Sequence, residues 1–385
     1  MKTSRGKFFI IAAFLCCLAF THTAKSQSWQ ATTAPAHMWA GIACSSNAVK
    51  IVAVAYAWQI YTSTDSGATW TARESVRQWQ ATASSAGGVN LVAVVYGGQI
   101  YTSTNSGVDW TPQATNRNWQ TVASSANGVR LVAGVNNGQI YTSDDAGVTW
   151  VARENNRAWA GVASSQDGSK LAAVVGAGQI YTSVNYGTNW TARESNRAWT
   201  SIASSANGSN LVAAAFSVLD TLPGRLCIST NAGINWTSYE TNRNWGAVAS
   251  STDGAKLLAA LRSGQLYIST NSGALWTSTA VTDHWNCVAS SWDGGKLFAA
   301  SDNTVGTGTG RIYVSPPTPT LLISRSGNIV KVYWQDVAGW NLQQNGNLVT
   351  PAGWSASGGI ILSNGTNYLD LVSPAGNLFF RLKNP

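Results

Sequence analysis

The sequence predicts an all-β protein, a seven-bladed β-propeller closed by its own N-terminal strand and followed by a small β-sandwich-like module. The first observation is a repeat: a tryptophan that opens a small-residue strand occurs seven times, at positions 39, 79, 119, 159, 199, 245 and 285. The spacings of 40, 40, 40, 40, 46 and 40 residues match the length of a four-stranded propeller blade. The second observation is local: segments such as QIYTS and KLAAVV are rich in β-formers and are bounded by Gly, Asn, Asp and Ser.

The repeat pattern also predicts how the ring closes. Six repeats end in a strand of the form S-x-D/N-x-G-x-x-W, with tryptophans at 70, 110, 150, 190, 236 and 276. The seventh repeat lacks this strand and runs into the prolines at 316–317. The missing strand is found at the front of the chain around Trp29, which precedes the first repeat tryptophan by 10 residues. The N-terminal strand is therefore expected to complete the last blade.

Four segments are predicted along the chain: a signal peptide at 1–26, the propeller at 27–315, a proline-rich linker at 316–319 and the C-terminal β module at 320–385. The first segment has a basic start, an apolar stretch and small residues before position 27, which is the pattern of an export signal. No later stretch holds about 18 apolar residues in a row, so no transmembrane segment is predicted. The protein is expected to be secreted, extracellular or periplasmic, either free or attached to a surface.

The composition suits an exported β-protein. Charged residues make up 10% of the chain and hydrophobic residues 44%, so a core can form while Ser, Thr, Asn and Gly supply solubility. The formal net charge is +8, but four basic residues and no acid lie in the first 26 positions, which leaves +4 for the rest. This mild charge, without a run of Lys or Arg, argues against nucleic acid as a partner. A monomer is expected.

Three cysteines follow residue 26: Cys44, Cys227 and Cys287. They share no metal-ligand spacing, and we interpret them as small buried strand residues. An odd number of cysteines is unusual for an exported chain, and the sequence leaves the state of these three residues open. No metal and no cofactor are expected.

The six strand-ending segments are predicted turns with a repeated acceptor and a repeated glycine. The acceptor side chains can take hydrogen bonds from loop amides, and the glycines allow positive φ. The acceptors are Asp65, Asn105, Asp145, Asn185, Asn231 and Asn271. A calcium loop is the minor alternative, because four of these six residues are uncharged Asn and no second carboxylate recurs.

These segments, from STDSGATW (63–70) to STNSGALW (269–276), carry a resemblance to a known family. On them, residues 28–315 resemble the Asp-box (BNR repeat) β-propellers, a broad group that includes sialidases, sortilin-type receptors, some xyloglucan hydrolases and the photosystem II assembly factors. The resemblance implies the propeller fold and says little about function, because this fold hosts many functions.

Strand direction assigns the loops of each blade to two faces. If the first strand runs from top to bottom, the loops between strands 4 and 1 and between strands 2 and 3 lie on the top face, and the Asp boxes lie below. The 4–1 loops carry a repeated arginine and a repeated glutamate before the strand-1 tryptophan. The candidate ligand-binding residues are Arg77, Arg117, Arg157, Arg197 and Arg243, Glu74, Glu154, Glu194 and Glu240, and Trp79, Trp119, Trp159, Trp199 and Trp245. His37 takes the arginine position in the first repeat, and Asp283 with His284 in the seventh.

Such a ring predicts several similar sites for sugars. Aromatic faces stack on the C–H faces of sugars, Arg with Glu can hold hydroxyls, and weak repeated sites gain from multivalency. The alternative is structural: the tryptophans wedge the blades apart, and Arg and Glu pair across adjacent blades.

Two repeats break the symmetry of the top face. The segments FSVLDTLPGR (216–225) and SDNTVGTGTGR (301–311) each add six residues to the 2–3 loop and place Arg225 and Arg311 where other repeats have Gln. Decay of the repeat explains these insertions, and a specific partner site beside them is the alternative.

The C-terminal module is predicted from alternating strands that contain Trp334, Trp340 and Trp354. Its last strand, with the sequence FFRL at 379–382, resembles the end of the short β-modules that close many exported bacterial proteins. The resemblance implies surface attachment or secretion sorting, and a stabilising role is the alternative.

The candidate chemistry argues against an enzyme. Glycoside hydrolysis needs two opposed carboxylates or a nucleophile with a partner acid, and no such set stands at non-repeated positions. Asp283 with His284 is the best single candidate. The leading function is a secreted, non-catalytic binding protein that recognises carbohydrate or glycoconjugate on the top face. A protein-interaction or assembly scaffold is the alternative, and a sialidase-like glycoside hydrolase is the third hypothesis. The expected partners are glycans or an extracellular protein.

Overall fold

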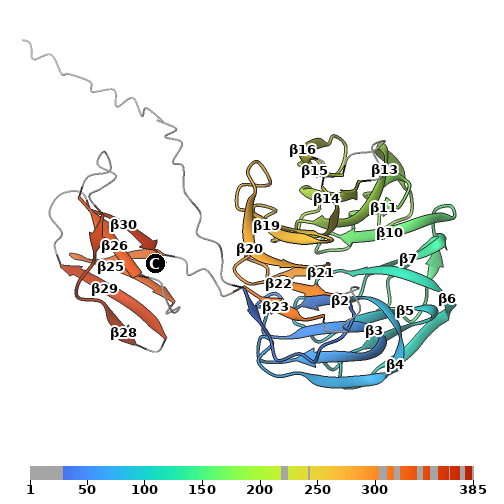
Figure 1. The fold of residues 1–385 in the computed structure, drawn as a ribbon, viewed down its shortest axis with the longest axis horizontal. Helices are drawn as coiled ribbons and strands as arrows, with labels where there is room; N and C mark the ends of the chain where they lie inside the picture. Colours follow the sequence, from blue (N-terminus) through green and yellow to red (C-terminus); the bar gives the residue numbers. More distant parts are fainter. Residues whose placement is uncertain are drawn as a thin grey trace, which may run out of the picture.

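The computed structural model describes residues 29–217, 224–241, 243–302, 310–315, 321–335, 341–346, 354–363, 365–372 and 378–383. All regular elements in these ranges are β-strands (Figure 1). None of the described residues form a helix that is long and apolar enough to cross a membrane. The predicted signal peptide and the predicted linker lie outside the described residues.

The strands of the propeller follow the sequence repeats in order. In the first three repeats they are β2 (Trp39–Cys44), β3 (Ile51–Ser63), β4 (Thr71–Ser84), β5 (Leu91–Ser103), β6 (Thr111–Ser124), β7 (Leu131–Gly138), β8 (Ile140–Ser143) and β9 (Val151–Ala152). In the fourth and fifth they are β10 (Arg157–Ser164), β11 (Leu171–Val175), β12 (Gly178–Ser183), β13 (Thr191–Ser204), β14 (Leu211–Phe216), β15 (Arg225–Ser229) and β16 (Thr237–Thr241). In the sixth and seventh they are β17 (Trp245–Ser250), β18 (Leu257–Leu261), β19 (Gly264–Ser269), β20 (Thr277–Asp283), β21 (Trp285–Ser290), β22 (Leu297–Ser301) and β23 (Ile312–Val314).

Each repeat uses the same antiparallel register. In the fourth repeat Trp159 pairs with Val175 and Ser164 with Leu171, and a β-bulge lies between Trp159 and Gly161. The same bulge follows the strand-1 tryptophan in all seven repeats. Some strands are shared by neighbouring repeats. Each of β4, β6 and β13 is one continuous strand that forms the last strand of one repeat and the first strand of the next, so it is hydrogen-bonded to strands of both repeats.

The burial of the second strands shows why the repeats pack radially. All five residues of β11 are buried, although alternate residues of a strand point to opposite faces. Both faces of this sheet are therefore covered. One hydrophobic cluster joins Val132 and Ile140 of the third repeat to Trp159, Leu171 and other residues of the fourth. The core is thus a series of such layers between neighbouring sheets.

The N-terminal strand closes the propeller. The short strand β1 (Gln30–Ala31) pairs antiparallel with β23, with Gln30 opposite Val314 and Ala31 opposite Tyr313. It completes a four-stranded sheet in the order β1-β23-β22-β21. Figure 1 shows the first strands (blue) beside the strands of the seventh repeat (orange).

A second feature also links the first and last repeats. Beside the 1–2 turn of each repeat, one backbone N–H donates to the carbonyl oxygen of the equivalent residue in the next repeat, at 2.7–2.9 Å. The seven residues form a closed ring: Ser46, Ala86, Ala126, Gln166, Ala206, Thr252 and Trp292, which donates back to Ser46. The ring has one member from each of the seven sequence repeats.

The C-terminal residues form two small antiparallel sheets. The first has the order β24-β25-β29-β28, and the second β27-β26-β30. Their bounds are β24 (Leu322–Ser326), β25 (Ile329–Gln335), β26 (Asn341–Asn345), β27 (Ser355–Ala356), β28 (Ile361–Ser363), β29 (Thr366–Val372) and β30 (Phe379–Lys383). Val332, Trp334 and Leu369 of the first sheet share one cluster with Leu342 of the second.

Candidate functional site

Hydrogen bonds between loops define the two faces of the propeller. The side chain of Gln59, in the 2–3 hairpin, donates to the carbonyl oxygen of Glu74 in the 4–1 connection. The backbone N–H of Ser66, in the first Asp box, donates to the carbonyl oxygen of Val49 in the 1–2 turn. The 2–3 and 4–1 loops therefore share one face, called the top face below, and the Asp boxes and 1–2 turns share the other, called the Asp-box face.

The six Asp-box acceptors organise their turns. Asp65 Oδ1 accepts hydrogen bonds from the N–H of Thr69 and the hydroxyl of Ser63, both at 2.8 Å. Ser63 in turn accepts the N–H of Gly67 at 2.9 Å. The equivalent bonds to loop amides are made by Asn105, Asp145, Asn185, Asn231 and Asn271. These side chains hold hairpin turns together. No group of three or more His, Cys, Asp or Glu in the described part of the chain could hold a metal ion.

These turns predict a loss of stability in acid. The hydroxyl of Thr69 is the main cause that lowers the pKa of Asp65 to about 2, from an ordinary value of 3.8. The hydroxyl of Ser165 does the same for Asp167 in a 1–2 turn, also to about 2. Because the folded-state pKa is lowered, the stabilisation is present above pH 4 and is lost as the pH falls towards 2. The melting temperature is expected to fall over this range when it is followed by circular dichroism.

The matched variant for this prediction is Asp65→Asn combined with Asp145→Asn. Four of the six boxes already have Asn at this position, so the turns are expected to remain formed. The variant should lose less stability between pH 4 and pH 2 than the wild type. Equal losses in the two proteins would exclude these carboxylates as the cause.

The structure changes the expectation for the repeated tryptophans. All seven strand-1 tryptophans, including the ligand candidates Trp79, Trp119, Trp159, Trp199 and Trp245, have at most 1% of their surface exposed. In six repeats they meet a tyrosine of the third strand edge to face, for example Trp79 and Tyr101 with ring centroids 5.1 Å apart. A side chain buried on both faces cannot stack on a sugar. Each of these residues packs in the core between its own sheet and the sheet of the preceding repeat.

In three of the described connections the repeated glutamate and arginine pair with each other within the same connection. Glu74 with Arg77, Glu154 with Arg157 and Glu194 with Arg197 lie at 3.4, 3.2 and 3.9 Å between side-chain oxygen and nitrogen. Burial alone would raise the pKa of Glu74, but hydrogen bonds from Ser75 and Arg77 outweigh it and lower the pKa. The side chain of Glu240 lies outside the described residues.

The arginines also lie over tyrosines. The guanidinium carbons of Arg77, Arg117, Arg157 and Arg243 are 4.5–4.9 Å from the ring centroid of the third-strand tyrosine in their own repeat. In the fifth repeat Cys227 replaces this tyrosine, and Arg197 lies 6.0 Å from Trp199. Arg117 is exposed and has Ala114 where other repeats have Glu. The five arginines thus lie near aromatic rings, with Arg77, Arg157 and Arg197 partly buried and Arg117 and Arg243 exposed.

The seventh repeat contains the best acid–base pair. His284 Nδ1 lies 2.5 Å from Asp302 Oδ1, and Asp302 is buried. Asp283 accepts the backbone N–H of His284 through Oδ1. This geometry fixes the imidazole by one carboxylate, which is the arrangement of an oriented base. Neither carboxylate faces the other across an open site, because Asp283 caps the backbone and Asp302 holds the ring.

An exposed tryptophan on the top face is one that the sequence analysis did not single out. Trp58 is 47% exposed, and its ring stacks on His37 with centroids 4.4 Å apart and planes 25° apart. His37 is fixed by a hydrogen bond between Nε2 and the hydroxyl of Tyr61 at 2.8 Å. Burial lowers the pKa of His37, so the imidazole is neutral at neutral pH.

A signal for Trp58 was present in the repeats. The other early repeats have glycine at this position, and a Cβ at Gly98 or Gly138 would lie 2.6 Å from Cγ1 of Val95 or Val135. The first repeat has Ala55 in place of that valine, which makes room for the larger side chain. Two linked departures from a regular repeat point to a specialised position.

The surface around Trp58 is apolar with one cation. Its members, called the Trp58 patch below, are Met38, Tyr56, Trp58, Val76 and Arg77. Met38, Tyr56 and Val76 are all exposed. Strand pairing brings them together, because the N–H of Tyr56 donates to the carbonyl of Met38, and Trp58 lies opposite Arg77 in the sheet register.

The first strands of the repeats enclose a central channel of about 400 Å³. Its lining is largely main chain and small side chains such as Gly41, Thr121 and Ser201, with Arg262 and Asn286 among the larger ones. Cys287 borders this channel, and burial raises the pKa of its thiol. Burial likewise raises the pKa of Cys44 to about 12, and the three described cysteines are free. The raised pKa values keep these thiols protonated at neutral pH.

The closed ring of radial sheets and the two loop faces define this chain as a β-propeller. No protein-family model matches the chain, and no curated protein matches it.

Solved structures match it by fold. YCF48 bound to D1 peptide has a TM-score of 0.57 at 15% identity, covering 76% of this chain and 96% of that one. The GH74 xyloglucanase from Xanthomonas campestris has a TM-score of 0.57 at 16% identity, covering 80% of this chain and 60% of that one. The Cps50 (Swd1) β-propeller domain from Myceliophteria thermophila has a TM-score of 0.58 at 13% identity, covering 76% and 100%. At these identities the likeness shows the propeller fold alone.

Proposed function

We propose that the protein is an exported, non-catalytic propeller that docks a polypeptide partner on its top face through the Trp58 patch. The observation that carries this proposal is the tryptophan itself, 47% exposed and held by the stacked His37. Exposing a large aromatic ring to water is unfavourable, and a ring fixed in one orientation loses little entropy on binding. Such residues are the usual anchors of protein interfaces.

The composition of the patch supports a polypeptide over a sugar. Aromatic residues, Met and Arg are enriched in protein interfaces, and the patch contains Tyr56, Trp58, Met38 and Arg77. Glu74 pairs with Arg77 and thereby sets the position of the cation beside the aromatic ring. The YCF48 structure with D1 peptide supports the same class of partner for a propeller of this shape.

We also propose that the protein is not an enzyme. The His284 and Asp302 pair offers one oriented base, and glycoside hydrolysis needs a second carboxylate across the substrate. Export also remains part of the proposal, since it depends on the sequence of the first 26 residues.

Glycan recognition by the repeated arginines and glutamates is the second candidate. It is favoured by the three Glu–Arg pairs that recur on the top face at similar geometry. Charge-assisted hydrogen bonds from such pairs suit hydroxyl groups. Because the strand-1 tryptophans are buried, glycan recognition on the top face would depend on the charged residues alone.

The test uses a displayed library of random peptides selected on the purified protein. Enriched peptides are expected, and the variant Trp58→Gly with Ala55→Val should bind them at least tenfold more weakly, because a central anchor contributes about 2 kcal/mol or more. This variant restores the pair found in neighbouring repeats, so the fold is expected to be unchanged. The affinities are measured by fluorescence anisotropy.

The control is Trp292→Ala, which removes an exposed tryptophan from the opposite, Asp-box end of the channel. It should leave peptide affinity unchanged. Selected peptides that bind the Trp58 variant as well as the wild type would refute the proposed docking surface.

A further inference from the structure

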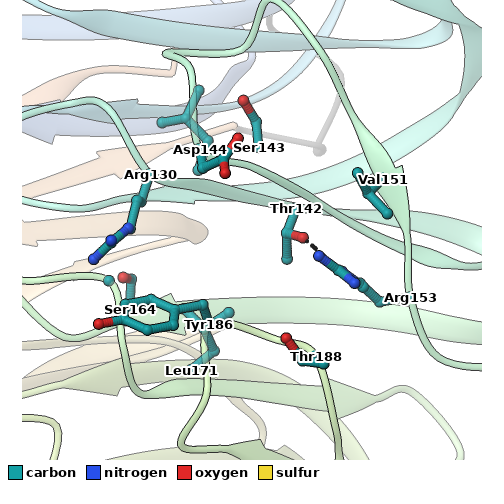
Figure 2. A pocket seen from close by; sticks show the side chains of 12 residues that line it. Arg130, Thr142, Ser143, Asp144, Val151, Arg153, Ser164, Leu171, Tyr186 and Thr188 are labelled. Atoms are coloured by element: carbon teal, nitrogen blue, oxygen red, sulfur yellow. Dashed lines mark hydrogen bonds between the residues drawn. The ribbon is translucent and has the colours of Figure 1, made fainter.

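A polar pocket of about 270 Å³ lies on the Asp-box face between the third and fourth repeats. Figure 2 shows the side chains that line it. Arg130 comes from the 1–2 turn of the third repeat, Asp144 from its Asp box, and Arg153 from the segment after β9. Tyr186 and Thr188 come from the Asp box of the fourth repeat. This pocket is called the 3–4 groove below.

The repeats provide an internal comparison for the 3–4 groove. The equivalent spaces between the first and second repeats and between the second and third each measure about 10 Å³. Much of the lining is the same, for example Leu91, Leu131 and Leu171 at one position.

Three positions differ between these spaces. The residues are Lys50, Asn90 and Arg130 at the first, Thr64, Thr104 and Asp144 at the second, and Ser106, Ala146 and Tyr186 at the third. The third groove has a charged or aromatic residue at all three positions, whereas the first has only Lys50 and the second has none. The larger cavity thus coincides with two departures from the repeat, Asp144 and Tyr186, beside a basic residue that also occurs in other repeats.

The side chains of the 3–4 groove support one another. The guanidinium carbon of Arg130 lies 4.0 Å from the ring centroid of Tyr186, and Arg130 also donates to the carbonyl of Asp167 at 2.9 Å. Tyr186 is held in a left-handed backbone conformation with φ of 60° and remains 46% exposed. Arg153 Nε donates to Thr142 Oγ1 at 2.9 Å, as the dashed line in Figure 2 marks. These contacts hold the arginines and Tyr186 of the groove in place.

The charges argue against a strongly anionic ligand. Two arginines, Arg130 and Arg153, are offset by Asp144 on the lining and by Asp145 and Asp167 close by. The groove instead offers donors and acceptors side by side, with the hydroxyls of Thr142, Ser143 and Thr188 added to the charged groups.

A sugar ring matches this set. Each sugar hydroxyl both donates and accepts, carboxylates and guanidinium groups make strong bonds to it, and its C–H face covers an aromatic ring. We propose that the 3–4 groove binds a neutral sugar residue of a glycan, with the part of the Tyr186 ring that Arg130 leaves exposed as the platform and Asp144 and Arg153 as the hydroxyl partners.

The test is an array of neutral oligosaccharides (glucans, galactans, mannans, xylans and chito-oligosaccharides) probed with the purified protein. The strongest binder is then titrated by calorimetry. Tyr186→Ser and Asp144→Thr are each expected to weaken binding at least tenfold, and Tyr186→Phe should retain it because the ring remains. Ser and Thr occur at these positions in other repeats, so the melting temperatures should stay within a few degrees of the wild type.

Matched controls separate this groove from other sites. Ser106→Ala and Thr64→Ala alter the narrow groove between the first two repeats and should have no effect on oligosaccharide binding.

The double variant Arg157→Ala with Arg197→Ala alters the top face. Loss of binding in that double variant, with Tyr186→Ser unaffected, would overturn the 3–4 groove and support the arginine ring. An array without any neutral binder would also overturn it. Peptide binding through Trp58 is measured separately, so failure of one proposal leaves the other standing.

Discussion

Replacement of Trp29 by alanine is expected to lower the melting temperature by about 10 °C. Trp29 is 7% exposed and packs in one cluster with Leu258 and Leu266 of the sixth repeat and Leu297 of the seventh. Removing a buried tryptophan costs about 3–5 kcal/mol, and each kcal/mol shifts the melting temperature of a domain of this size by roughly 2–4 °C. The residue also anchors the strand that pairs with β23.

Deletion of residues 27–34 should have a larger effect, because it also removes the backbone pairing and the hydrogen bond from Thr32 N–H to the carbonyl of Ile312. It would leave an open edge on the seventh sheet, which favours aggregation. Differential scanning calorimetry measures both variants. Trp292→Ala is the control, since that tryptophan is 42% exposed and should change the melting temperature by about 1 °C or less. An unchanged melting curve for the deletion would rule out closure by this strand.

Replacement of Gly107 by alanine is the second large expected effect, a fall of about 8 °C. Gly107 has φ of 82° in the second Asp box, where a side chain costs roughly 1–2 kcal/mol. A Cβ would also lie 2.7 Å from Cγ2 of Thr62 and 3.1 Å from Cδ1 of Leu91. Overpacking of this kind costs about 1–3 kcal/mol more.

Gly97→Ala is the matched control in the same repeat. Gly97 also has positive φ, 71°, but a Cβ there meets nothing within 4 Å. The first and third repeats have Ala57 and Asn137 at this position, with φ of 58° and 56°. The control should therefore lose about 1 kcal/mol or less. Equal losses for the two variants would mean that backbone strain alone matters, and that the contact between blades does not.

Both predictions concern features that could be predicted from the sequence: the closing strand and the Asp-box turns. The 40-residue spacing, the β-rich segments and the strand missing from the seventh repeat predicted a propeller and its closure, and β1 does pair with β23. The Asp-box acceptors lie in the turns where the pattern placed them. These features depend on short segments or on regular spacing along the chain, so they can be recognised in one amino-acid sequence.

The candidate site was harder to predict. A repeat in the sequence shows which residues occupy equivalent positions, but it does not show which side chains they contact in space. The strand-1 tryptophans looked available for sugars, but the sheet of the preceding repeat packs against each of them. The glutamates and arginines pair three residues apart, which sequence spacing allowed but did not decide. Trp58 stood at a glycine position, a departure that the repeat comparison could have revealed.

The sequence by itself thus determined the strands, their order, the turn chemistry and the closing strand, because these depend on residue type and spacing along the chain. Only the tertiary structure decided which aromatic rings are covered, and which repeats enclose a pocket. The 3–4 groove combines Arg130 and Tyr186, which are 56 residues apart in the chain. Their contact exists because radial packing sets the 1–2 turn of one blade against the Asp box of the next, and that distance in space cannot be read from either repeat alone.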